Sequence, residues 1–175
     1  MAERAVGDKV IRVIRGDITD MSVEAFVYDV TADCKLSSGY GGAIVSRGGK
    51  AIQDELSRVG TLPTGEATVT SAGGLKAKHI IHVNGPKFHE PDTKGKLARA
   101  VRSALAQADE KGITVVASPP IGTGLYQVPI DVSAKVIVDT VTEQLSNGSG
   151  VREVLLVALD AREVKPFEAA LQGGN

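Results

Sequence analysis

The second half of the chain alternates β-rich runs with helical runs, and this alternation constrains the fold more than any other feature. Residues 113–117 are typical of a strand, a helix follows from Pro129, and residues 154–159 are typical of the next strand. An apolar stripe over residues 164–171 predicts a closing helix. Strands that follow one another through a helix pair in parallel by a right-handed crossover. The sequence therefore predicts an α/β fold built on a layered sheet.

The first half adds strands of both kinds to this sheet. Residues 10–14 and 24–30 are apolar without clean alternation, which indicates strands covered on both faces. Residues 67–71 and 79–83 are joined by a short turn and are expected to pair antiparallel. A helix is expected over residues 42–56, with a break at its glycine pair. The prediction is a three-layer α/β/α sandwich with a mixed central sheet.

Length and composition indicate one intracellular domain. The 175 residues fit a single domain, predicted over residues 1–175 with its core at about 10–171. No run of some twenty apolar residues is present, which argues against a membrane partner, and the N-terminus has no apolar stretch of signal-peptide length. Cys34 is the single cysteine, so no disulfide can form within the chain. We expect a cytoplasmic protein.

Glycine-rich loops follow three of the predicted strands, over residues 16–19, 37–42 and 121–126. Ligands of open α/β sheets bind at the carboxyl ends of strands. Glycine allows backbone N–H groups to approach a ligand closely, and a helix start behind such a loop adds unpaired donors. Two facing loops of this kind would suit two linked phosphates. Neither the Walker pattern nor Gly-x-Gly-x-x-Gly is present, which argues against a P-loop NTPase and a dinucleotide Rossmann enzyme.

Four short motifs resemble those of macro domains in order and spacing. They are Gly16-Asp17-Ile18-Thr19, Thr64-Gly65-Glu66-Ala67, His82-Val83-Asn84-Gly85-Pro86 and the segment 121–126. The resemblance spans nearly the whole chain, about residues 10–171. It implies the same three-layer fold and a cleft for ADP-ribose at the carboxyl edge of the sheet.

The resemblance also assigns ligand contacts residue by residue. Asp17 is expected to accept a hydrogen bond from the adenine amino group, with the Ile18 amide nearby. The proximal ribose and the diphosphate are expected beside Ser38, Gly39, Tyr40, Gly41 and Gly42. The second loop would hold the phosphates with Gly122, Thr123, Gly124 and Leu125, and Tyr126 would lie beside the distal ribose.

The chain departs from the hydrolytic macro domains at the positions that carry their chemistry. Those proteins usually have Asn-Ala-Ala-Asn after the second strand, whereas this chain has Tyr28-Asp29-Val30-Thr31. Thr31 replaces the asparagine that holds the distal ribose, and Gly41 replaces the aspartate often assigned to activating water. A second hydrolytic subgroup uses a lysine and an aspartate where this chain has Asn84 and Tyr126. We therefore assign no catalytic residue.

Side chains near the altered segment are candidate replacements for the missing catalytic groups. Asp29 and Asp33 flank the altered segment, and Asp33 is a candidate base if burial raises its pKa, the alternative being a solvated loop residue. Cys34 has no histidine near it in sequence, which favours a small buried residue over a nucleophile. The three histidines lack partners at metal-ligand spacing, so neither a metal nor a cofactor is expected.

The favoured function is binding of ADP-ribose, of a related adenine nucleotide or of ADP-ribosylated protein. One alternative is hydrolysis of ADP-ribosyl esters or of O-acetyl-ADP-ribose by substrate positioning alone. Another is RNA or poly(A) binding through the same adenine pocket. A net charge of −1, 3% aromatic residues and no Trp argue against strong nucleic-acid binding. The oligomeric state is left open.

Overall fold

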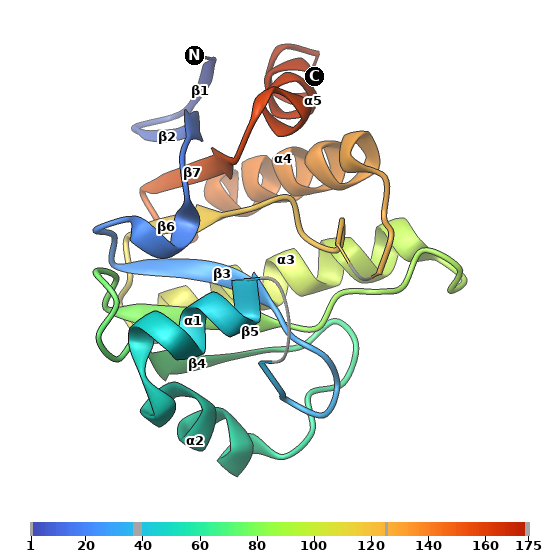
Figure 1. The fold of residues 1–175 in the computed structure, drawn as a ribbon. Helices are drawn as coiled ribbons and strands as arrows, with labels where there is room; N and C mark the ends of the chain where they lie inside the picture. The colour runs from blue at the N-terminus through green and yellow to red at the C-terminus, as the bar shows by residue number, and fades with distance from the viewer. Residues whose placement is uncertain (1, 37–39, 125, 174–175) are drawn as a thin grey trace.

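A seven-stranded mixed sheet forms the centre of the molecule (Figure 1). The computed structural model describes residues 2–36, 40–124 and 126–173. The strand order is β1-β2-β7-β6-β3-β5-β4. Strands β2, β7, β6, β3 and β5 run parallel, and the two edge strands β1 and β4 pair antiparallel with β2 and β5. The strand bounds are β1 Glu3–Val6, β2 Lys9–Arg15, β3 Ala25–Asp29, β4 Ala67–Ser71, β5 His79–Val83, β6 Val115–Ser118 and β7 Glu153–Ala158.

Helices cover both faces of this sheet, which confirms the predicted three layers. Helices α1 (Tyr40–Gly48) and α2 (Lys50–Val59) lie against one face. Helices α3 (Thr93–Glu110), α4 (Ile130–Ser146) and α5 (Ala161–Gln172) lie against the other. Each face has its own apolar core, one centred on Phe26, Ile44, Ile52 and Ile80, the other on Val27, Leu97, Ile137, Leu156 and Phe167.

Most elements lie where the sequence predicts them. Strands β4 and β5 have the expected bounds and the expected antiparallel pairing. The predicted break in the first long helix is confirmed, because Gly49 has a φ of +93° and separates α1 from α2. A side chain would be strained in that conformation, whereas glycine adopts it freely.

Strand β1 was not predicted from the sequence. Its short run is partly polar, and it forms an exposed edge that pairs with β2 across a turn at Gly7, where φ is +62°. Arg4 on this strand donates hydrogen bonds to the carbonyl oxygens of Ala170 and Leu171. These bonds hold the N-terminal strand against the end of α5, where helix carbonyls lack partners within the helix.

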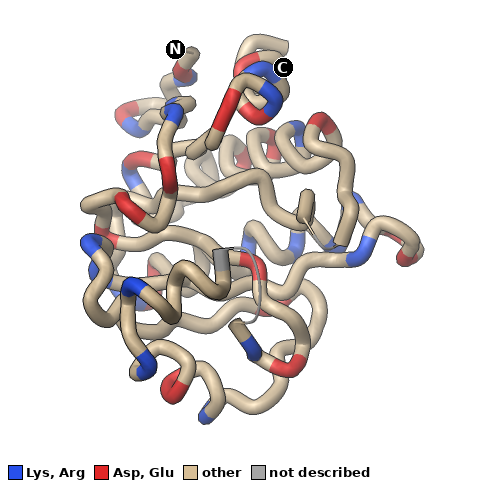
Figure 2. Tube along the Cα trace, in the orientation of Figure 1, with Lys and Arg blue, Asp and Glu red and all other residues tan. Residues whose placement is uncertain are grey.

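Charges of both signs are interspersed along the chain (Figure 2). Among the helices in the described ranges, none is long and apolar enough to cross a bilayer.

Strand β3 positions the site that follows. Ala25 and Val27 belong to the core under α3, α4 and α5, and Phe26 belongs to the core on the opposite face. Because successive side chains of a strand point to opposite faces, Tyr28 and Asp29 start from opposite sides of the sheet. They stand at the carboxyl end of β3, where the sheet opens into a cavity.

Candidate functional site

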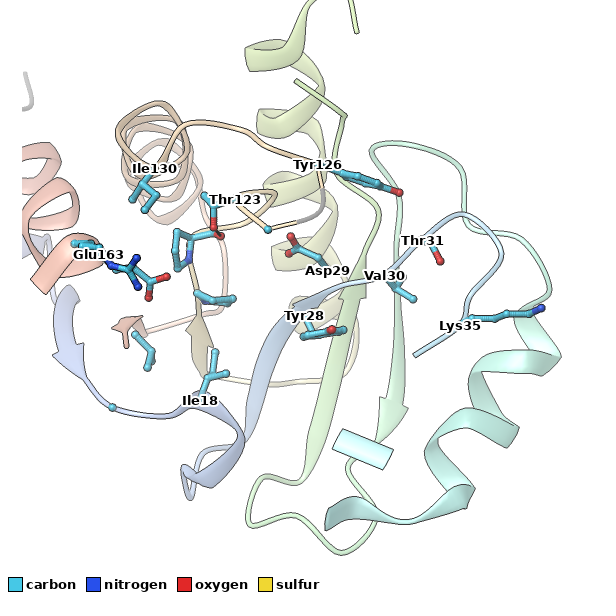
Figure 3. A pocket seen from close by; sticks show the side chains of 16 residues that line it. Ile18, Tyr28, Asp29, Val30, Thr31, Lys35, Thr123, Tyr126, Ile130 and Glu163 are labelled. Carbon is cyan, nitrogen blue, oxygen red and sulfur yellow. Dashed lines mark hydrogen bonds between the residues drawn. The ribbon is translucent and has the colours of Figure 1, made fainter. Parts of the chain in front are cut away.

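A cavity of about 440 Å³ lies at the carboxyl ends of β2, β3, β6 and β7 (Figure 3). Parallel strands bring their carboxyl ends to one edge of the sheet, so loops far apart in sequence meet there. The cavity is lined by Gly16, Ile18, Tyr28, Asp29, Val30, Thr31, Lys35, Pro119, Pro120, Thr123, Gly124, Tyr126, Ile130, Val157, Arg162 and Glu163. Two of the three predicted glycine loops, at residues 16–19 and 121–126, therefore contribute to one cavity.

The loop after β6 is held in shape by its own hydrogen bonds. The Val128 amide donates to the Gly122 carbonyl oxygen at 2.9 Å, and Ser133 Oγ donates to the Ile121 carbonyl oxygen at 2.6 Å. Thr123 and Gly124 face the cavity. A Cβ at Gly124 would meet no atom within 4 Å, so the space beside this backbone is open. Leu125 lies outside the described residues.

Asp29 contacts this loop from across the cavity. The Gly122 amide donates to Asp29 Oδ2 at 2.5 Å. Asp29 Oδ1 is buried and has no hydrogen-bond partner among the residues that the structure describes. Burial raises the pKa of Asp29 from 3.8 to about 7, although the Gly122 hydrogen bond opposes the shift. One amide expected to contact phosphate is thus occupied by a carboxylate.

Tyr28 and Gly41 lie in close contact. The Tyr28 hydroxyl oxygen lies 3.0 Å from the position that a Cβ of Gly41 would occupy, and the Leu36 backbone lies 3.3 Å from it. A side chain at position 41 would therefore be tightly packed against Tyr28 and the segment before α1, which would have to shift by a few tenths of an ångström. Gly41 and Gly42 lie in the first turn of α1, and neither lines the cavity.

Asp17 lies beside the cavity rather than in its lining. Its Oδ1 accepts hydrogen bonds from the Thr19 amide at 2.9 Å and from Thr19 Oγ1 at 2.7 Å. Its Oδ2 lies 3.4 Å from Arg47 Nη1. Burial alone raises the pKa of Asp17, but these hydrogen bonds outweigh burial and hold the pKa below its usual value. The adenine contact stays a prediction, while Ile18, its neighbour, does line the cavity.

The other end of the cavity leads into a second groove of about 700 Å³. Thr31, Lys35 and Tyr126 line both spaces. Thr31 Oγ1 donates to the Asp33 carboxylate. Asp33 lines the second groove and does not line the first. Lys87 Nζ lies 5.9 Å from the centre of the Tyr126 ring.

The positions of the second hydrolytic subgroup do meet in space. The Tyr126 hydroxyl donates to Asn84 Oδ1 at 3.2 Å, and Asn84 Nδ2 donates to the Leu62 carbonyl oxygen at 2.7 Å. A phenol and an amide occupy these positions, and neither supplies the lysine and carboxylate of that subgroup.

Two of the candidate side chains, Cys34 and His82, have structural roles. Cys34 is fully buried among apolar residues, and burial raises the pKa of its thiol, which disfavours the nucleophilic thiolate. His82 is buried in β5, where its Nε2 lies 2.9 Å from Thr70 Oγ1. Neither residue lines the cavity.

Several lining residues were not identified from the sequence, namely Lys35, Pro119, Pro120, Ile130, Val157, Arg162 and Glu163. The signal for the last two was the strand end of β7, which is followed by a helix capped by Asp160, whose side chain accepts from the Arg162 amide at 2.9 Å. Ser38 and Gly39 lie outside the described residues. Tyr40 begins α1.

Comparison with known sequences places the chain beside macro domains. A sequence profile described as Macro domain matches residues 30–137. A macro domain-containing protein of Streptomyces coelicolor is 39% identical over 168 residues, which cover 92% of this chain and 98% of that protein. An uncharacterised protein of Pyrobaculum aerophilum is 36% identical over 169 residues, covering 94% of this chain and 92% of the relative.

Solved structures have the same fold. A mutant of the Oceanobacillus iheyensis macrodomain superposes with a TM-score of 0.91 at 25% identity, covering 99% of this chain and 97% of that one. Another mutant of that macrodomain, with ADPR, has a TM-score of 0.92 at 24% identity and covers 98% and 97%. The Trypanosoma brucei macrodomain in complex with ADP-ribose has a TM-score of 0.84 at 23% identity and covers 90% and 67%.

Proposed function

The chain belongs to the macro domain family, and from that premise we propose that its cavity binds ADP-ribose, free or attached to a protein. The observation that carries the proposal is the meeting of two glycine loops at one cavity on the carboxyl edge of the sheet. Gly16 and Gly124 both line it, and a Cβ at either position would meet no atom within 4 Å. Backbone this accessible suits a closely bound ligand, with the diphosphate beside Gly124.

The ligand would extend along the cavity in one direction. The adenine would lie at the apolar end beside Ile18 and Val157, and the phosphates would lie beside Thr123 and Gly124. The distal ribose would point toward Tyr126, where the second groove begins. A protein segment attached to that ribose would then continue into the second groove. The related macrodomains with ADPR or ADP-ribose support this choice of ligand.

We infer that binding, rather than hydrolysis, is the function of this site. Thr31 offers a single hydroxyl, which is engaged with Asp33, in place of an amide with a donor and an acceptor. Gly41 has no side chain to orient water, and the Tyr28 hydroxyl lies only 3.0 Å from where a Cβ at this position would stand.

Calorimetry with ADP-ribose tests the proposal. The wild type should bind, and Gly124→Val should weaken binding at least about tenfold, because the new side chain would stand where the phosphates approach the backbone. Gly150→Val is the matched control, since Gly150 is exposed on a distant loop where a Cβ makes only ordinary contact at 3.5 Å. Equal affinities for both variants, or no heat at millimolar ADP-ribose, would exclude this function.

A further inference from the structure

The Asp29 carboxylate, at the end of β3, contacts the loop to which the proposed function assigns the phosphates. Its Oδ2 already accepts from the Gly122 amide, and its Oδ1 has no partner in the described part of the chain although it is buried. In Figure 3 the Asp29 side chain lies beside the loop that carries Thr123, with Tyr126 on its other side. An anionic ligand group on this loop must therefore share the space with Asp29.

The two protonation states of Asp29 treat such a ligand in opposite ways. An ionised carboxylate accepts hydrogen bonds only, and it repels a phosphate strongly in a site that excludes water. A protonated carboxyl keeps one oxygen as acceptor for the Gly122 amide and carries no charge, so it does not repel a phosphate on the same loop. Protonation also avoids leaving a buried, charged Oδ1 without a partner.

The charged and titratable groups around Asp29 do not neutralise it. Tyr28 on the same strand and Tyr126 on the facing loop are phenols, and burial, together with Asp29, raises the pKa of each. Arg162 at the start of α5 forms an ion pair with Asp160 at 2.8 Å, and Glu163 lies beside it. The loop after β3 adds an exposed lysine and an exposed aspartate, and β5 adds the buried imidazole beside Tyr28, namely Lys35, Asp33 and His82.

We propose that Asp29 couples ligand binding to the uptake of one proton, so that the cavity accepts a diphosphate with Asp29 in its neutral form. This inference rests on the proposed function and adds its dependence on pH. Burial places the pKa of Asp29 at about 7 in the free protein. The free protein must therefore be protonated before it binds whenever the pH is higher, and affinity falls about tenfold per pH unit above that value.

Calorimetry with ADP-ribose from pH 6 to 8.5 tests the coupling. The diphosphate of ADP-ribose is esterified at both ends and does not titrate near neutrality, so the profile reports on the protein. The wild type should bind about 30-fold more weakly at pH 8.5 than at pH 6. Measurements at pH 8 in two buffers of different ionisation enthalpy should show uptake of about one proton per ligand.

Asp29→Asn is the decisive variant. Its amide oxygen can accept from the Gly122 N–H as the protonated acid does, and the side chain carries no charge at any pH. The variant should bind at every pH about as tightly as the wild type does at pH 6, with no proton uptake. Asp33→Asn removes a neighbouring carboxylate, and His89→Gln removes the imidazole of the second groove. Both controls should keep the 30-fold change.

The outcomes separate this inference from the function on which it rests. If ADP-ribose binds equally at all pH values without proton uptake, the coupling is wrong and the binding function stands. If affinity lost at pH 8.5 returns with Mg²⁺ in the wild type only, Asp29 holds a cation and the proton coupling is overturned. If neither the wild type nor Asp29→Asn binds at any pH, both proposals are excluded.

Discussion

Asp29 and His82 are both ionisable side chains with buried polar atoms, and burial shifts their pKa values in opposite directions. The pKa of Asp29 rises from 3.8 to about 7, and the pKa of His82 falls from 6.5 to about 4. The cause is the same in both cases, because the surroundings disfavour whichever form carries charge. In each residue one polar atom also lacks a hydrogen-bond partner within the described ranges, namely Asp29 Oδ1 and His82 Nδ1.

The raised pKa of Asp29 predicts that this residue destabilises the free protein at high pH. Its contribution to stability is fully present below pH 3.8 and is lost as pH rises through about 7. Relative to the wild type, Asp29→Asn should therefore gain stability as pH rises from 4 to 8, by up to about 4 kcal/mol. Urea unfolding at both pH values measures the difference. A difference that does not change with pH would contradict the buried, ionised carboxylate, and Asp33→Asn serves as the exposed control.

At the scale of elements, strand β3 and helix α1 fit together through one tyrosine and one glycine. Tyr28, the residue before the last of the strand, lies beside the first turn of the helix, where its hydroxyl and the Leu36 backbone crowd the space around Gly41. Gly42 is the next residue on the same helix, and a Cβ there would meet nothing within 4 Å. An aspartate introduced at position 41 should therefore be accommodated better when residue 28 is smaller.

This fit predicts opposite effects of alanine at two adjacent glycines. Gly42→Ala should stabilise the protein by about 0.5–1 kcal/mol, because alanine has the higher helix propensity. Gly41→Ala should destabilise it by about 1–3 kcal/mol, because the methyl group overpacks the site. The cost of Gly41→Ala should shrink in a Tyr28→Phe background, which a double-mutant cycle of unfolding free energies would reveal. Equal effects of the two alanines would refute the proposed fit.

On the scale of the whole molecule, the two shifted groups oppose each other in the stability profile. His82 binds a proton more readily in the unfolded chain, so its contribution is lost as pH falls from 6.5 through about 4. Asp29 contributes the reverse slope over a similar range. The wild type therefore changes less with pH than either group would dictate alone.

Removing the histidine should expose this balance. Relative to the wild type, His82→Phe should become more stable as pH falls from 6.5 to 4, by up to about 3 kcal/mol. Thermal or urea unfolding across that range measures the trend. The trend matters rather than the offset, since Thr70 loses one of its two hydrogen-bond partners in the variant. His89→Gln, which changes an exposed histidine, should run parallel to the wild type. A parallel profile for His82→Phe would show that the buried imidazole does not resist protonation.

Much of the architecture was determined by the sequence alone, because it depends on local preferences. Apolar runs, turn residues and the break near Gly49 predicted the strands, the helices and the antiparallel pair within a few residues. Motif order predicted the family, and the strand-end rule predicted which edge of the sheet carries the cavity. The partly polar strand β1 was not predicted, because it is stabilised by contacts with its neighbours and its own sequence lacks the apolar pattern of a strand.

Only the tertiary structure decided which lining residues contact one another. Asp29 and Gly122 are 93 positions apart, and only the parallel pairing of β3 with β6 brings the carboxylate to the loop amide. Likewise, only the structure gives a reason for glycine at position 41, because it places the Tyr28 hydroxyl close beside that residue. Local sequence predicts which elements form, whereas burial and long-range contact set the protonation and the free volume of a site.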